Sequence, residues 1–135
     1  MLRFKYWIIS ILIAAGIITA AFAVTNNITG VAPTTNTDGS ALTNLASIRI
    51  YKAVLTGTNP DCTAAGTVYS VFQTVPYTTA GGSFSVADTL ATTTGRYCYQ
   101  ATAINTSGTE SARTSPVWKD VDLRIPSPPT NLIVQ

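Results

Sequence analysis

Hydrophobic and polar residues alternate along much of this chain, so that every second side chain is apolar over several short segments. The clearest case is residues 96–105, in which Tyr97, Tyr99, Ala101 and Ala103 share one parity. A period of two is typical of β-strands that bury one face. This succession predicts an all-β fold with two sheets packed as a sandwich. Turn-forming residues separate the segments, and we predict strands over residues 24–32, 48–54, 67–75, 83–86, 96–105 and 115–123.

The same alternation predicts which side chains form the core. Within residues 48–54, Arg49 and Tyr51 should lie on the face opposite to the apolar side chains and the aliphatic stem of Lys52. The predicted core consists of Ile48, Ile50, Phe84, Val86, Tyr97, Tyr99, Ala101 and Ala103.

Residues 1–23 follow a different pattern and are predicted to be a signal helix. A short basic head precedes an apolar run from Tyr6 to Ala20, and small residues follow at Ala21 and Ala23. This layout is typical of a secretory signal peptide, with cleavage after Ala23. The alternative is a retained membrane anchor, because the apolar run is just long enough to span a bilayer. Either outcome predicts an exported domain, whether periplasmic, secreted, cell-surface or virion-associated.

Removal of residues 1–23 leaves a chain without net charge. Of the eight basic residues, Arg3 and Lys5 are removed, which leaves six against six acidic ones. Neither sign is clustered along the sequence. Nucleic-acid binding relies on clustered Lys and Arg that face phosphates, so this function is not expected. A membrane contact is expected only through the signal segment, if it is not cleaved.

Side chains suited to catalysis are scarce. The chain has no His, and its only Glu, Glu110, stands in a predicted turn beside Ser111. A nucleophilic Ser needs a base that can accept and return a proton, so we predict a protein that is not an enzyme and has no cofactor. Asp120 and Asp122 share a face, and with Asp61 or Asp88 they offer oxygen ligands of the kind calcium prefers. Solvated carboxylates are the favoured interpretation, and no metal site is expected.

Cys62 and Cys98 are the only cysteines. Two cysteines behind a signal peptide predict a disulfide, with two free thiols as the alternative. Alternation places Cys98 on the face away from Tyr97, and Cys62 lies in the loop after residues 48–54. A loop folded across the sheet would bring the two sulfur atoms together.

Two blocks resemble fibronectin type III domains of bacteria and their phages. One is Ala32-Pro-Thr-Thr-Asn-Thr-Asp-Gly-Ser-Ala-Leu-Thr-Asn-Leu-Ala-Ser-Ile-Arg-Ile-Tyr51, and the other is Tyr97-Cys-Tyr-Gln-Ala-Thr-Ala-Ile-Asn-Thr-Ser-Gly-Thr-Glu-Ser111. The resemblance implies an immunoglobulin-like, fibronectin type III β-sandwich over residues 24–125. It also implies that Tyr97 is the corner tyrosine of the family, whose hydroxyl bonds to nearby backbone.

The chain departs from this family at both ends of the predicted sandwich. Gly30 stands where the family usually has a core Trp, and the family's first strand is missing. Pro128–Val134, within the Pro-rich C-terminal tail of residues 126–135, resembles that first strand. A sandwich without this strand has an unpaired edge, and one hypothesis is that the tail donates a strand to another molecule through Leu132 and Val134. The favoured interpretation is a tail that is mobile or lies on its own domain.

These observations predict an exported, non-catalytic module for binding, adhesion or structural assembly. Its partner would be a protein or a surface glycan, and self-association through the tail is one route. Trp118 and Tyr51 are candidate contact residues, since Trp and Tyr often anchor interfaces; Trp118 would otherwise cover the position of the missing strand. The alternative function is a carbohydrate-binding accessory domain, which requires a row of exposed aromatic side chains drawn from Tyr51, Tyr69, Tyr77 and Trp118.

Overall fold

The computed structural model describes residues 24–58, 60–91, 93–124 and 126–127. These residues form two antiparallel sheets and no helix, so the all-β prediction is confirmed, and the arrangement is consistent with a β-sandwich. The predicted signal helix, its cleavage after Ala23, and the strand-like residues Leu132 and Val134 lie outside the described residues.

The strands agree in number and order with those predicted. Two of them extend beyond the predicted bounds by more than one residue at an end. β4 continues well past residue 86, and β2 begins three residues before residue 48. The strands are β1 (Val24–Val31), β2 (Leu45–Leu55), β3 (Ser70–Pro76), β4 (Ser83–Ala91), β5 (Gly95–Asn105) and β6 (Val117–Val121).

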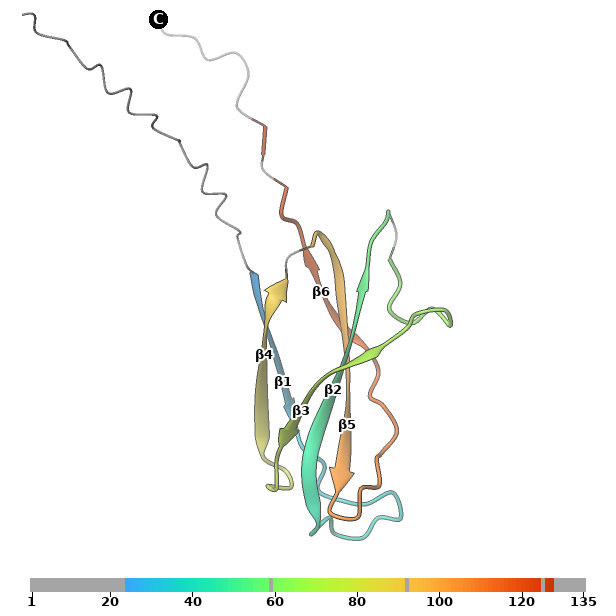
Figure 1. The fold of residues 1–135 in the computed structure, drawn as a ribbon. Coiled ribbons are helices and arrows are strands. Elements are labelled where there is room, and N and C mark those ends of the chain that lie inside the picture. The colour runs from blue at the N-terminus through green and yellow to red at the C-terminus, as the bar shows by residue number, and fades with distance from the viewer. Residues whose placement is uncertain (1–23, 59, 92, 125, 128–135) are drawn as a thin grey trace, which may run out of the picture.

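The two sheets differ in width. One contains only β1 and β4, whereas the other has the order β3-β2-β5-β6, as Figure 1 shows. Asn26 of β1 donates a hydrogen bond to Tyr99 of β5, and Lys52 of β2 pairs with Asp88 of β4. The narrow sheet therefore lies over β5 and β2. β6 is covered in part: Val121 belongs to the core between the sheets, whereas Val117 is exposed.

The core lies between the sheets and has the predicted phase. Ile48, Ile50, Val86, Tyr97 and Tyr99 are all buried. The remaining three predicted core residues are only partly buried, which corrects the expectation for them. All three line a hollow at the open side of the sandwich; they are Phe84 of β4 and Ala101 and Ala103 of β5.

The Tyr97 side chain closes the turn that precedes β5. Its hydroxyl donates a hydrogen bond to the carbonyl oxygen of Thr93 at 2.9 Å and accepts one from the Thr93 amide at 3.2 Å. The expectation that this hydroxyl bonds to nearby backbone is confirmed.

A disulfide lies on the opposite face of the wide sheet. Cys62 and Cys98 are bonded, with their α-carbons 5.8 Å apart. Together with Ala53 they form a small buried cluster, separate from the main core. Cys98 thus faces away from Tyr97, as alternation predicted. Structural disulfides of this kind are typical of an oxidising compartment.

Candidate functional site

The outer edge of β1 has no strand partner among the described residues. At the end of β1, the Ala32 amide donates to the Gly82 carbonyl oxygen, and the Ala32 carbonyl accepts from Gly81. Backbone groups of successive residues in a strand point to opposite edges. The amide and carbonyl groups of Asn27, Thr29 and Val31 therefore point away from β4, toward the side where a further strand would pair.

A groove of about 430 Å³ lies beside this edge, and we call it the β1 groove. β1 forms one wall, residues 111–117 form the other, and β5 contributes to the floor. None of its lining side chains is charged. The lining residues are Ile28, Thr29, Gly30, Val31, Pro33, Ile48, Phe84, Tyr99, Gln100, Ala101, Thr102, Ala103, Ser111, Ala112, Thr114, Ser115 and Val117.

Val117 shows that the inner face of the wide sheet is left uncovered at the β1 groove. It pairs in register with Tyr99, whose side chain points into the core, so Val117 lies on the same inner face. Tyr99 is buried, yet Val117 remains 59% exposed. Val121, two positions further along this face of β6, is again buried. The uncovered part of this face therefore includes Val117 and does not extend to Val121.

Gly30 and Phe84 shape the β1 wall of the groove. They are paired in register, and a Cβ on Gly30 would lie only 2.6 Å from the ring of Phe84. The Phe84 ring therefore occupies the space that a side chain at position 30 would need. It also packs edge-on against Tyr77, with ring centroids 6.1 Å apart. Because Gly30 has no side chain, the Phe84 ring forms the apolar surface of this wall.

A buried polar cluster lies between the sheets, behind the groove. The fully buried Asp88 carboxylate accepts hydrogen bonds from Lys52 Nζ at 3.1 Å and from the Tyr99 hydroxyl at 2.8 Å. Asn26 donates to the same hydroxyl at 2.8 Å. Burial raises the pKa of Tyr99 well above its usual range, so this phenol stays protonated. The cluster joins β1, β2, β4 and β5.

Sequence reasoning missed the role of Asp88. Asp88 was considered only as an oxygen ligand that could join Asp120 and Asp122, and the predicted strand ended before it, at residue 86. The longer β4 instead directs the carboxylate inward, where Lys52 compensates its charge. Alternation predicted that Lys52 lies on the same face as Ile48. It did not indicate that Asp88 is the partner of Lys52.

Glu110 fixes the opposite wall of the groove to the outer face of the wide sheet. Its carboxylate accepts from Arg49 Nη1 at 2.6 Å, from Thr102 Oγ1 at 2.5 Å and from the Tyr51 hydroxyl. The hydrogen bonds from Thr102 and Tyr51, with the positive charge of Arg49, hold the pKa of Glu110 below its usual range. Arg113 stacks over the Tyr51 ring, 3.9 Å from its centroid. Glu110 is thus an ionised acceptor that anchors the segment after β5.

The four aromatic residues considered for glycan binding do not form an exposed row. Tyr51 is only 7% exposed, whereas Trp118 is 55% exposed. Tyr69 and Tyr77 are half-buried, and their hydroxyls donate to the carbonyl oxygens of Cys62 and Ser83.

Trp118 lies outside the groove. It follows Val117 directly, so alternation places it on the outer face of β6, where the Arg96 guanidinium lies 5.4 Å from its ring. It therefore does not cover the inner face of the wide sheet beside β1. Trp118 and Tyr51 share the outer face of this sheet, and neither lines the β1 groove.

The carboxylates considered as metal ligands are used in local contacts. Asp120 forms two hydrogen bonds with Arg96, at 2.7 and 2.8 Å. Asp122 pairs with Arg124, whose hydrogen bonds lower the pKa of the Asp122 carboxyl to about 2. Asp61 accepts from the amide and hydroxyl of Thr63. In the part of the chain that the structure describes, no group of three potential ligands is gathered around one point.

Comparison with known proteins gives no relative: no family model, no curated protein and no solved structure matches the chain. The described residues also contain no helix that is long and apolar enough to cross a membrane.

Proposed function

We propose that this chain is an exported, non-catalytic assembly module that binds an extended segment as an added strand along the outer edge of β1. The observation that carries this proposal is the coincidence of two features at one place. The backbone groups of Asn27, Thr29 and Val31 point toward an edge without a strand partner in the described residues, and the uncharged β1 groove lies directly beside them.

Strand addition uses both features. Main-chain hydrogen bonds to an exposed edge supply affinity, and alternate side chains that enter pockets supply specificity. An incoming strand would direct every second side chain into the groove, against Ile28, Phe84 and Val117. The absence of charge along the lining favours apolar or neutral side chains.

The proposed fold is a fibronectin type III-like sandwich that lacks its first strand. The sheet orders β1-β4 and β3-β2-β5-β6 support this assignment, since a first strand would pair with β1 on its outer edge. The hydrogen bonds of Tyr97 to Thr93 support it as well. The Cys62–Cys98 disulfide supports export to an oxidising compartment.

A selection from displayed random peptides of about 12 residues tests strand binding. The bait is the exported chain carrying Leu132→Asp and Val134→Asp, so that its own tail does not compete. We expect enrichment of uncharged peptides with alternating apolar residues. Their binding should be lost in Thr29→Pro, because proline removes an outward amide without removing a hydrogen bond to β4.

Thr29→Ala is the matched control, because it trims the same side chain and keeps the amide. Bound peptides should therefore retain their affinity for Thr29→Ala. Failure to enrich any peptide, or equal binding by the Thr29→Pro and Thr29→Ala proteins, would contradict the proposed function.

A further inference from the structure

Residues 128–135 match the β1 groove in chemistry and in length. They carry no charged side chain, and the groove lining carries none either. Residues 128–135 number eight, as do the residues of β1. In an extended conformation, Leu132 and Val134 would share one face, so both could enter the groove from one added strand.

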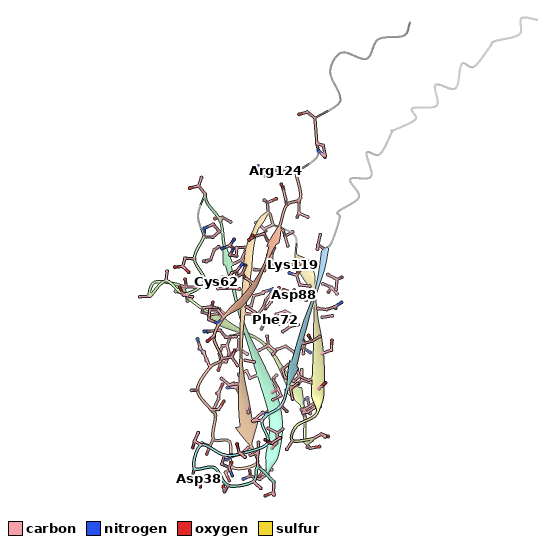
Figure 2. All side chains as sticks on the ribbon, turned by 180° about the vertical axis from the view of Figure 1, so that it is seen from behind. Asp38, Cys62, Phe72, Asp88, Lys119 and Arg124 are labelled. Atoms are coloured by element: carbon pink, nitrogen blue, oxygen red, sulfur yellow. A yellow bond between two sulfur atoms is a disulfide. The ribbon has the colours of Figure 1, made fainter. Side chains whose placement is uncertain are left out.

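The direction of the strands decides how these residues can reach the groove. β6 leaves the sandwich at the end where β1 begins (Figure 1), and Arg124 lies at this end in Figure 2, opposite to Asp38 in the loop after β1. Every described strand pair is antiparallel. A strand added antiparallel to β1 must begin beside Val31, at the far end from Arg124, and finish beside Val24.

The same molecule cannot supply such a strand from its own tail. The eight residues of β1 are joined by seven Cα–Cα steps, which extend over about 24 Å at about 3.4 Å per step. Arg124 still lies at the β6 end in Figure 2, and the four steps from Arg124 to Pro128 reach at most about 14 Å when fully extended. Prolines at 126, 128 and 129 favour an extended chain rather than a tight reversal.

We infer that residues 128–135 of one copy add as an antiparallel strand to β1 of a second copy, with Leu132 and Val134 in its β1 groove. This inference rests on the proposed function and names its ligand. A tail that leaves one molecule at the β6 end enters the next at the end marked by Val31. The contact is heterologous, so each copy offers one tail and one groove, and the assembly continues unless a ring closes.

Molar mass measured by light scattering during gel filtration tests this inference on the exported chain. The wild-type protein is expected to rise from monomer to about twice the monomer mass or more as its concentration increases. Leu132→Asp/Val134→Asp, the tail variant, should stay monomeric because charge is costly in an apolar groove. Asn131→Asp/Gln135→Asp places the same added charge on the opposite face and should still associate.

Mixing two defective variants tests the head-to-tail arrangement itself. Thr29→Pro, the edge variant, keeps its tail but loses the outward amide of its groove, so it should be monomeric alone. An equimolar mixture with the tail variant should form a one-to-one complex of twice the monomer mass, and nothing larger. Only a contact between one tail and one groove predicts this complementation, because the mixture contains a single productive pair.

Circular dichroism establishes that the edge variant is folded. If it is not, Val117→Asp replaces it, because Val117 is already exposed to solvent in the unassembled domain. A wild-type protein that is monomeric up to about 1 mM would overturn the inference, whether or not tail substitutions alter its stability. Association that survives in both variants would overturn it too. If the selected peptides bind the groove but the tail does not, this inference fails and the proposed function still stands.

Discussion

At the scale of single residues, the Asp88 carboxylate is the most constrained group between the two sheets. It is fully buried, and Lys52 and Tyr99 both contact it from the wide sheet. A buried charge is tolerated only when it is paired and hydrogen-bonded. These contacts join strands of different sheets, so they help to hold β4 over β2 and β5.

Lys52→Met is expected to lower the free energy of unfolding by about 3 kcal/mol, because breaking a buried ion pair leaves a charge poorly compensated. Urea denaturation of the purified protein measures the change. Lys119→Met is the matched control: Lys119 is exposed, so its substitution should change stability by less than about 0.5 kcal/mol. Equal effects of the two substitutions would show that the Lys52–Asp88 pair does not stabilise the fold.

The lowered pKa of Glu110 predicts that the stability of the folded protein depends on pH. Its pKa in the folded protein lies below the ordinary value of 4.5, so its contribution is complete above that value and is lost as pH falls through the lowered pKa. Glu110→Gln should therefore destabilise the protein by about 1 kcal/mol near neutral pH. The difference from wild type should shrink as pH falls below 4.5 and through the lowered pKa. Thermal unfolding of both proteins, measured from neutral pH to below pH 4.5, checks this prediction. A stability difference that is constant with pH would contradict it.

At the scale of elements, the two connections that cross the wide sheet are fastened to its outer face by long-range contacts. The loop between β2 and β3 is joined to β5 by the Cys62–Cys98 disulfide. The segment between β5 and β6 is held by Glu110 through Arg49, Tyr51 and Thr102. This second connection forms one wall of the β1 groove, and backbone hydrogen bonds of Ser111 and Thr114 to β5 hold the wall in place together with Glu110.

Removal of the disulfide is expected to cost about 4 kcal/mol, the chain-entropy value for a closed loop of this length. The Cys62→Ala/Cys98→Ala protein should unfold at lower denaturant concentration than the oxidised wild type. Dithiothreitol should lower the midpoint of the wild type and leave that of the double variant unchanged. A wild-type midpoint that is insensitive to reduction would contradict a stabilising bond.

At the scale of the whole molecule, the unequal width of the two sheets is the decisive feature. Two strands cannot cover the inner face of four, and the uncovered part lies against β6 and residues 111–117. Exposed strand edges invite pairing with other chains, and proteins commonly guard them with charge. Lys119 is the only charged residue on the inner face of β6, whereas the groove lining itself is uncharged.

Association through the β1 groove should depend little on salt. The chain after residue 23 has no net charge, and neither the groove nor residues 128–135 contribute a charged side chain. Screening by salt acts on charges, so the wild-type molar mass should be similar from about 50 to 500 mM NaCl. Dissociation at the higher concentration would indicate an ionic contact elsewhere on the surface.

Much of the fold was predictable from local patterns. Alternation located the strands along the chain and indicated on which face Ile48, Lys52 and Cys98 lie. It could do so because the side-chain period of a strand depends only on neighbouring residues. It failed at the end of β4, since Thr89 and Asp88 are polar and nothing local indicates that Asp88 is buried. Alternation also predicted that Ala101 is buried like Ile50, although only Ile50 is covered by the narrow sheet.

The sequence by itself therefore determined an all-β chain, its strand phase, a cysteine pair on one face and an uncharged strand-like stretch at residues 128–135. The tertiary structure alone decided that Asp88 meets Lys52, that Glu110 holds the wall of the groove, and that Val117 stays uncovered. Each of these depends on residues far apart in the chain, such as Lys52 and Asp88, which are separated by 36 positions. The periodicity of one strand does not indicate which strand will lie opposite it.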